Sequence, residues 1–342
     1  IGYETGTIFP DPSKASNSSV LFESTSSSSA IDTRTLEKSL VNYNNVRILT
    51  GAGDSSQEGN IIWEADADLD YSSASASLTL DAAGSIELNS NITTGSGGLA
   101  LNAAEGFAEA SNQITLNLSG PLEILTGDSG IGTAGFTAPA FAATLTGEGD
   151  LSKSGTGRLI ISGDSSSWQG NTVVEAGALR VTDANALGSS TSLTSVQSEG
   201  TLEISGGIEL SQPILLSKGK LMSLSGSNSL TDGLQLTGSS TIEVVEDSLT
   251  LAPSSGKALI VDSGNSSFNS DLTFAGAGDL TVKGILNLQD GQKIKTYGDF
   301  LQTGTGLARF EEAFFAERAE VTGGGVIWMD QADEVDIEVN TF

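Results

Sequence analysis

The chain is dominated by a short apolar alternation that recurs along almost its whole length. Aliphatic residues stand two positions apart, as in Leu78/Leu80 and Leu159/Ile161, and Gly, Ser, Asn or Asp separates one such pair from the next. A period of two is typical of a β-strand with one buried face. Successive pairs lie roughly 6 to 13 residues apart, which leaves room for a few extended residues and a turn. The pattern therefore predicts an all-β chain made of many short strands.

Two all-β architectures share this spacing, a sandwich and a parallel β-solenoid. A sandwich of this length would be expected to have longer strands and more aromatic residues than the 6% present. Unbroken ladders of small aliphatic residues favour the β-solenoid (parallel β-helix), in which each coil stacks like residues on like. With about 20 residues per coil, the chain would form about 15 to 17 coils.

In such a stack the alternation assigns each side chain to the inside or the outside. Arg158 stands one position before an inward residue and is predicted to point outward. The predicted inward residues include Leu159, Ile161, Leu179 and Val181. Corners require residues that tolerate left-handed backbone. The predicted corner residues include Gly155, Gly157, Gly170 and Gly177.

Composition excludes several classes of function. The chain has no histidine and no cysteine, which rules out a Ser-His-Asp triad, a thiol nucleophile, a thiolate zinc site and a disulfide framework. It has 43 acidic and 15 basic residues, and the net charge of −28 repels nucleic acid and anionic lipid. No segment approaches the roughly 18 apolar residues of a membrane-spanning helix. We therefore expect no nucleic-acid partner and no membrane-spanning segment.

The segment from Gly147 to Gly188 has the most specific pattern in the chain. It opens with GxGDL and Lys153, and it continues with the stretch WQGNT from Trp168 and with AGALRV from Ala176. These residues resemble the passenger-associated transport repeat of autotransporter passengers. The resemblance implies a β-helix coil near the part of the passenger that folds first and helps secretion.

A second resemblance covers about residues 30 to 125. The stretches SLTLDA from Ser77, IELNSNI from Ile86 and GGLALNA from Gly97 are similar to segments of filamentous-haemagglutinin-like exoproteins. Both families are right-handed parallel β-helices, so the resemblance implies that fold for this chain. It also implies export, to the extracellular space or the bacterial cell surface.

Three segments are expected along the chain. Residues 1–29, with two prolines and a serine run, are predicted to be an N-terminal arm or linker. Residues 30–306 are predicted to form the β-solenoid, and residues 307–342 a helical decoration and a C-terminal strand of the same solenoid. One or two short decorating helices are expected, at Asp32–Leu40, which has a capping candidate, and at Phe310–Glu320, which lacks glycine.

Acidic residues supply one candidate metal site. The candidate calcium ligands are Glu64, Asp66, Asp68 and Asp70. An EF-hand loop does not fit, because its sixth position would be Tyr71 and its twelfth Ser77. Alternation offers a second interpretation, in which Trp63, Leu69 and Tyr71 point inward and the four acids form a solvated outer face. Apart from this possible calcium, no cofactor is predicted.

The sequence therefore predicts an exported, non-enzymatic β-solenoid rod that acts as a structural or adhesive element of the cell surface. No catalytic residue is predicted. One alternative is a subunit that polymerises head to tail into an extracellular filament or surface layer, with residues 1–29 docking onto the next chain. A second alternative is a carbohydrate-active β-helix enzyme. The sequence does not specify a receptor, whether on a host, on another surface or on a glycan.

Overall fold

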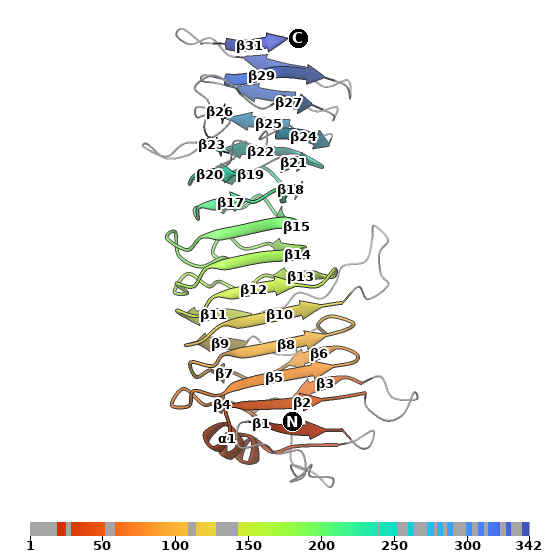
Figure 1. Cartoon of the computed structure of the whole chain (residues 1–342), viewed down its shortest axis with the longest axis vertical. Coiled ribbons are helices and arrows are strands. Elements are labelled where there is room, and N and C mark those ends of the chain that lie inside the picture. Colours follow the sequence, from red (N-terminus) through yellow and green to blue (C-terminus); the bar gives the residue numbers. More distant parts are fainter. Residues whose placement is uncertain are drawn as a thin grey trace. The chain divides into compact units, whose positions relative to one another are not determined.

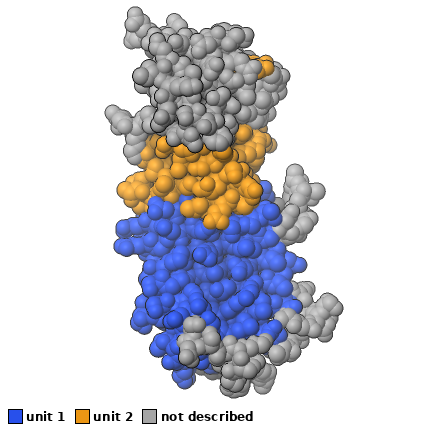
Figure 2. Space-filling view, in the orientation of Figure 1, with its two compact units in different colours: residues 1–172 blue, residues 173–342 orange. Residues whose placement is uncertain are grey.

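The computed structural model describes residues 19–24, 29–51, 59–108, 114–127, 143–237 and 240–251 together with their side chains, and beyond residue 251 the strands named below. The described chain is nearly all-β, with parallel strands stacked as a β-solenoid and a single short helix. It forms two compact units, residues 1–172 and 173–342, shown in different colours in Figure 2. The predicted all-β parallel solenoid is confirmed.

Unit 1 is built from ladders of parallel strands that lie one above another (Figure 1). The first ladder contains β1 (Ser19–Glu23), β2 (Asn45–Leu49), β5 (Ser77–Ala82), β8 (Leu99–Ala103), β10 (Leu122–Thr126) and β12 (Leu151–Ser154). The second contains β4 (Leu69–Asp70), β7 (Ile92–Thr93), β9 (Ile114–Leu118) and β11 (Ala143–Gly147). A third pairs β3 (Ile61–Trp63) with β6 (Ile86–Leu88), and β13 (Arg158–Ile161) follows β12.

The core of unit 1 consists of columns of inward side chains, one from each coil. Leu78 pairs with Leu99, Leu99 with Leu122, and Leu122 with Leu151, and each is at most 2% exposed. Each coil alone would leave its apolar edge in water, so burial comes from the coils above and below. Leu159 and Ile161, and Leu179 and Val181 of unit 2, are likewise at most 1% exposed, and Arg158 is exposed. The predicted inward and outward positions are confirmed.

The coils are longer than expected. The first ladder returns after 21 residues between Leu78 and Leu99, and after 32 residues between Val46 and Leu78. Fewer coils than the predicted 15 to 17 therefore fit into the chain. The prediction was wrong because the apolar pairs record only the strands, whereas corner loops of variable length separate them.

One corner of unit 1 is a column of glycines because consecutive coils approach too closely there for a side chain. A Cβ atom on Gly149 would lie 1.9 Å from the carbonyl oxygen of Gly120, and one on Gly170 would lie 2.1 Å from that of Gly149. Gly155 is needed for a different reason, since its φ angle of 76° is left-handed. Gly177 also has a left-handed φ angle, 67°, but it lies within the strand Thr172–Val181 and not at the predicted corner. Stacked corners thus account for much of the glycine in the sequence.

The helix α1 (Thr33–Asn42) confirms the prediction for Asp32–Leu40. Asp32 is its N-cap and accepts a 2.9 Å hydrogen bond from the Thr35 N–H, which lowers the pKa of the Asp32 carboxyl. Leu36 and Leu40 are buried, and the helix packs against β2 and β4. It therefore decorates the solenoid rather than interrupting it.

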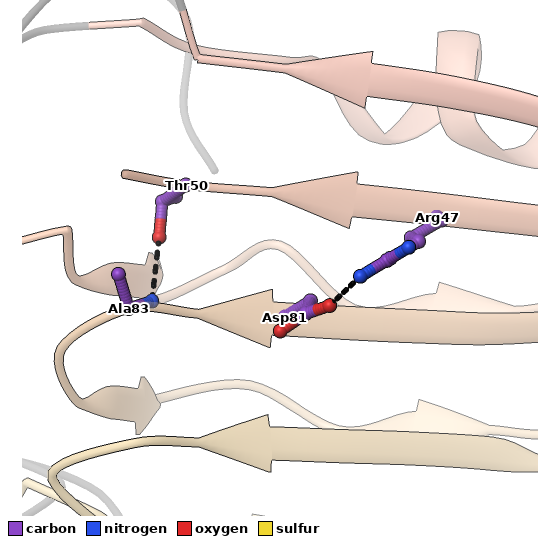
Figure 3. Close-up of polar contacts among 4 residues, drawn as sticks. All are labelled: Arg47, Thr50, Asp81 and Ala83. Atoms are coloured by element: carbon purple, nitrogen blue, oxygen red, sulfur yellow. Dashed lines mark hydrogen bonds and ion pairs between the residues drawn. The ribbon is translucent and has the colours of Figure 1, made fainter. Parts of the chain in front are cut away.

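Polar side chains also join neighbouring coils on the outer surface. Figure 3 shows Arg47 on β2 ion-paired with Asp81 on β5, and the Ala83 N–H donating a 3.3 Å hydrogen bond to the Thr50 hydroxyl. The Arg47 side chain is 51% exposed, so water screens this ion pair and it contributes little to stability.

Unit 2 is also built from ladders of parallel strands. Its strand β15 (Thr194–Ser205), which follows β14 (Thr172–Val181), starts two ladders. One continues through β18 (Lys220–Ser225), β21 (Ser240–Val244), β24 (Leu272–Gly276), β27 (Asp299–Gln302) and β29 (Phe314–Val321). The other continues through β17 (Ile214–Leu216), β20 (Leu234–Leu236), β23 (Leu259–Asp262), β26 (Leu286–Gln289), β29 and β31 (Ile337–Thr341). A third ladder contains β16 (Glu209–Leu210), β19 (Asn228–Leu230), β22 (Ser248–Leu251), β25 (Asp279–Val282), β28 (Leu307–Phe310) and β30 (Val326–Met329).

The helix predicted at Phe310–Glu320 is wrong. Phe310 ends β28, and β29 is an eight-residue strand that pairs in parallel with β26, β27 and β31. The four-residue spacing of Phe310 and Phe314 fits a period of two as well as a helical period. Neighbouring strands supply backbone partners along both edges of β29, which outweighs a local helix propensity. The helical decoration expected within residues 307–342 is therefore replaced by strands.

The N-terminal boundary also differs from the prediction. Residues 19–23, placed in the arm of residues 1–29, form β1 and pair in register with β2. Val20 and Phe22 are 2% and 0% exposed, so this strand belongs to the solenoid. Residues 1–18 of the predicted arm lie outside the described residues.

Candidate functional site

The segment of residues 143–172, one coil of unit 1 and the start of the next, contains several buried polar side chains, and one of them, Lys153, takes a position that is aliphatic in the coils before it. It contains β11, β12 and β13 and ends beside the corner glycine Gly170. Its buried polar side chains are Lys153, Ser165 and Thr172, each at most 1% exposed. We call residues 143–172 the polar coil.

Lys153 stands where the inner column otherwise holds aliphatic residues. It pairs with Ile124, which in turn pairs with Leu101 and so continues the column from Leu80. Its ammonium Nζ donates hydrogen bonds to the carbonyl oxygens of Ser154 and Gly155, at 2.7 and 3.0 Å. Burial disfavours the charged form and lowers the pKa of Lys153 from 10.5 to about 8.

Trp168 lies further along the polar coil. The indole is 0% exposed, and its Nε1–H donates a 2.8 Å hydrogen bond to the carbonyl oxygen of Gly149 in the preceding turn of chain. The nearby Gly170 has room only for a hydrogen atom, since a Cβ atom there would lie 2.5 Å from the same indole nitrogen. Glycine at position 170 therefore allows the tryptophan to reach its carbonyl partner.

Two further side chains replace backbone acceptors in the ladder. The Asn171 N–H donates to Asp150 Oδ1 at 2.7 Å, and the Leu145 N–H donates to Ser165 Oγ at 2.9 Å. Trp168, Asp150, Ser165 and Lys153 thus all bond to the main chain. Buried main-chain groups that would be unpaired at the corners are satisfied in this way. The polar coil is chemically suited to closing and holding a turn of the stack.

Comparison with known protein families agrees with this geometry. Residues 151–181 match the model of the passenger-associated transport repeat. No curated protein and no solved structure matches the chain. The repeat and the β-solenoid fold together are consistent with an autotransporter passenger. Within the described residues, no helix has the length and apolar character needed to span a membrane.

The structure does not assemble the predicted calcium ligands into a metal site. Glu64, Asp66, Asp68 and Asp70 are all exposed, and Trp63, Leu69 and Tyr71 point inward at 0–2% exposure. Asp68 accepts the N–H of Asn91, and Asp70 accepts that of Ser72, which lowers the pKa of the Asp70 carboxyl. Across the described part of the chain, no three acidic residues are grouped so that they could hold a metal ion.

Sequence reasoning identified the polar coil but missed the burial of its lysine. Lys153 was noticed only as a landmark of the repeat. The missed signal is the alternation itself: Leu151 points inward, so the residue two positions later must also point inward. The strand β12 follows this rule, because Leu151 and Lys153 are buried and Ser152 and Ser154 are half-exposed.

Proposed function

We propose that this chain is an exported, non-enzymatic β-solenoid that serves as a structural or adhesive element at the bacterial cell surface. The match of residues 151–181 to the passenger-associated transport repeat carries this proposal, because that repeat on a β-solenoid is consistent with an exported autotransporter passenger. In the described part of unit 1, mostly apolar side chains fill the inner columns, and most outward positions of the strands are polar.

The outer face of the second ladder shows what such a solenoid offers to its surroundings. Thr115 pairs with Thr144, and Asn117 pairs with both Thr93 and Thr146. All five side chains are exposed or half-exposed. Stacking at about 4.8 Å places their hydroxyl and amide groups in regular rows. Regular rows of exposed hydroxyl and amide groups are suited to presentation and contact with a partner surface.

Surface exposure is tested on intact bacteria that produce the protein from its own gene. Antibodies raised against residues 143–251, which contain the polar coil, are used to follow digestion by an added protease. We expect loss of the antibody signal on intact cells and survival of a cytoplasmic marker protein. Digestion only after cell lysis would refute the proposed location.

Adhesion is tested separately with the purified chain on a panel of immobilised glycans. We expect saturable binding that decreases when Thr115 and Thr144 are both replaced by valine, which removes two hydroxyls with little change in shape. The matched control is Thr79→Val on the first ladder. If binding is absent, or is equal in all three proteins, the adhesive role is refuted and only the structural role remains proposed.

A further inference from the structure

The polar coil brings several energetically unfavourable groups together at one corner of unit 1. Thr126, at the end of β10, is 0% exposed, and its hydroxyl has no hydrogen-bond partner. Gly155 lies directly above it, since a Cβ atom on Gly155 would be 2.2 Å from the Thr126 carbonyl oxygen. Lys153 bonds to the carbonyl oxygen of this same Gly155. A buried lysine and an unsatisfied hydroxyl thus share one corner, which raises the free energy of its closed state.

The opposite corner of the polar coil also has a buried hydroxyl without a hydrogen-bond partner, that of Thr172, but it has no buried charge. The Trp168 indole has its carbonyl partner, and Asp150 has its amide partner in Asn171. The inner columns around both corners are similarly apolar. The corner at Thr126, Lys153 and Gly155 therefore differs from the other corner by its buried charge, and we expect it to be the less stable of the two.

We propose that this corner is the point at which unit 1 opens locally, and that the charge on Lys153 promotes the opening. In the open state water solvates the ammonium and the Thr126 hydroxyl, whereas in the closed state neither is solvated. The charged groups on the elements beside β12 are Glu123 on β10, Arg158 on β13, and Glu175 and Arg180 on β14. Glu123, Arg158 and Glu175 occupy exposed positions, and Arg180 is half-exposed and paired with Glu203. Opening is confined to the corner because Trp168 and Asp150 hold the rest of the coil.

The pH dependence of this opening has a definite sign. The pKa of Lys153 is about 8 in the closed state and near 10.5 when the side chain is solvated. Between these values the open state binds a proton that the closed state lacks, so the closed state gains stability as pH rises. Below pH 8 the lysine is charged in both states and the penalty is constant. Opening is therefore most frequent at neutral and acidic pH.

Hydrogen–deuterium exchange of the full chain tests the proposal, with peptides covering residues 122–127 and 151–161 measured at pH 7 and pH 9.5. After correction for intrinsic exchange rates, we expect protection to rise about tenfold or more in the wild type, since one pKa unit corresponds to a factor of ten. Lys153→Met should be highly protected at both pH values. Lys153→Arg, which stays charged, should be weakly protected at both.

The matched control is Lys220→Met, which removes a lysine paired with Glu243 on the outer face of unit 2. It should leave the exchange of both peptides and its pH dependence unchanged. An equal pH response in the wild type and in Lys153→Met would overturn the proposal. If Lys153→Met does not fold, Lys153→Arg decides alone, because a wild-type pH response in that variant would equally overturn it.

Discussion

Replacing Ile161 by aspartate tests the inward and outward assignment on which the whole fold rests. Ile161 is 0% exposed on β13, and Arg158, three positions earlier on the same strand, is exposed. Ile161→Asp removes a buried aliphatic side chain and places a carboxyl group in the apolar column. We expect a loss of at least ~3 kcal/mol in the free energy of unfolding. Arg158→Asp should change that free energy by only about 0.5 kcal/mol.

Urea unfolding followed by circular dichroism measures both values, and Ile161→Val is the control for simple loss of volume, at about 0.5–1.5 kcal/mol. The aspartate penalty should also shrink at pH 4, because a buried carboxyl has a raised pKa and is neutral there. Equal effects of Ile161→Asp and Arg158→Asp would refute the assignment. A penalty that does not change with pH would show that the new carboxyl reaches water.

Three further predictions concern the corner, ions and assembly. Trp168→Phe should lower the free energy of unfolding by about 1–3 kcal/mol in urea melts, because it leaves the buried Gly149 carbonyl unpaired; an unchanged midpoint would contradict this. Added salt should raise the melting temperature by screening the net charge of −28, and calcium should act no more strongly than sodium of matched ionic strength, because Asp68 and Asp70 already accept N–H groups. A larger effect of calcium would show that the acids do form a site. Head-to-tail association remains a prediction, and deleting residues 1–18 should then reduce particle size in light scattering; a full-length chain that is strictly monomeric would exclude it.

Much of the fold could be predicted from the sequence because a β-strand exposes its two faces alternately. The Leu78/Leu80 and Leu159/Ile161 pairs were assigned correctly inward, and the cap at Asp32 located the helix α1. The helix expected at Phe310–Glu320 failed because its spacing also fits a strand, and only the neighbouring strands distinguish the two. The prediction of the coil length failed for a related reason, because the length of the corner loops does not change the apolar pattern.

The sequence by itself determined the class of fold, the inside and outside of strands such as β5 and β13, and the repeat in residues 151–181. The tertiary structure alone decided which coil lies on which, and therefore what each polar residue contacts. In the sequence, Lys153 is one more residue of an alternating strand. Only the structure shows that it pairs with Ile124 and that its ammonium donates hydrogen bonds to the carbonyl oxygens of Ser154 and Gly155. The paired residues of the solenoid are separated by 19 to 32 positions, and the local pattern carries no information about contacts at that distance.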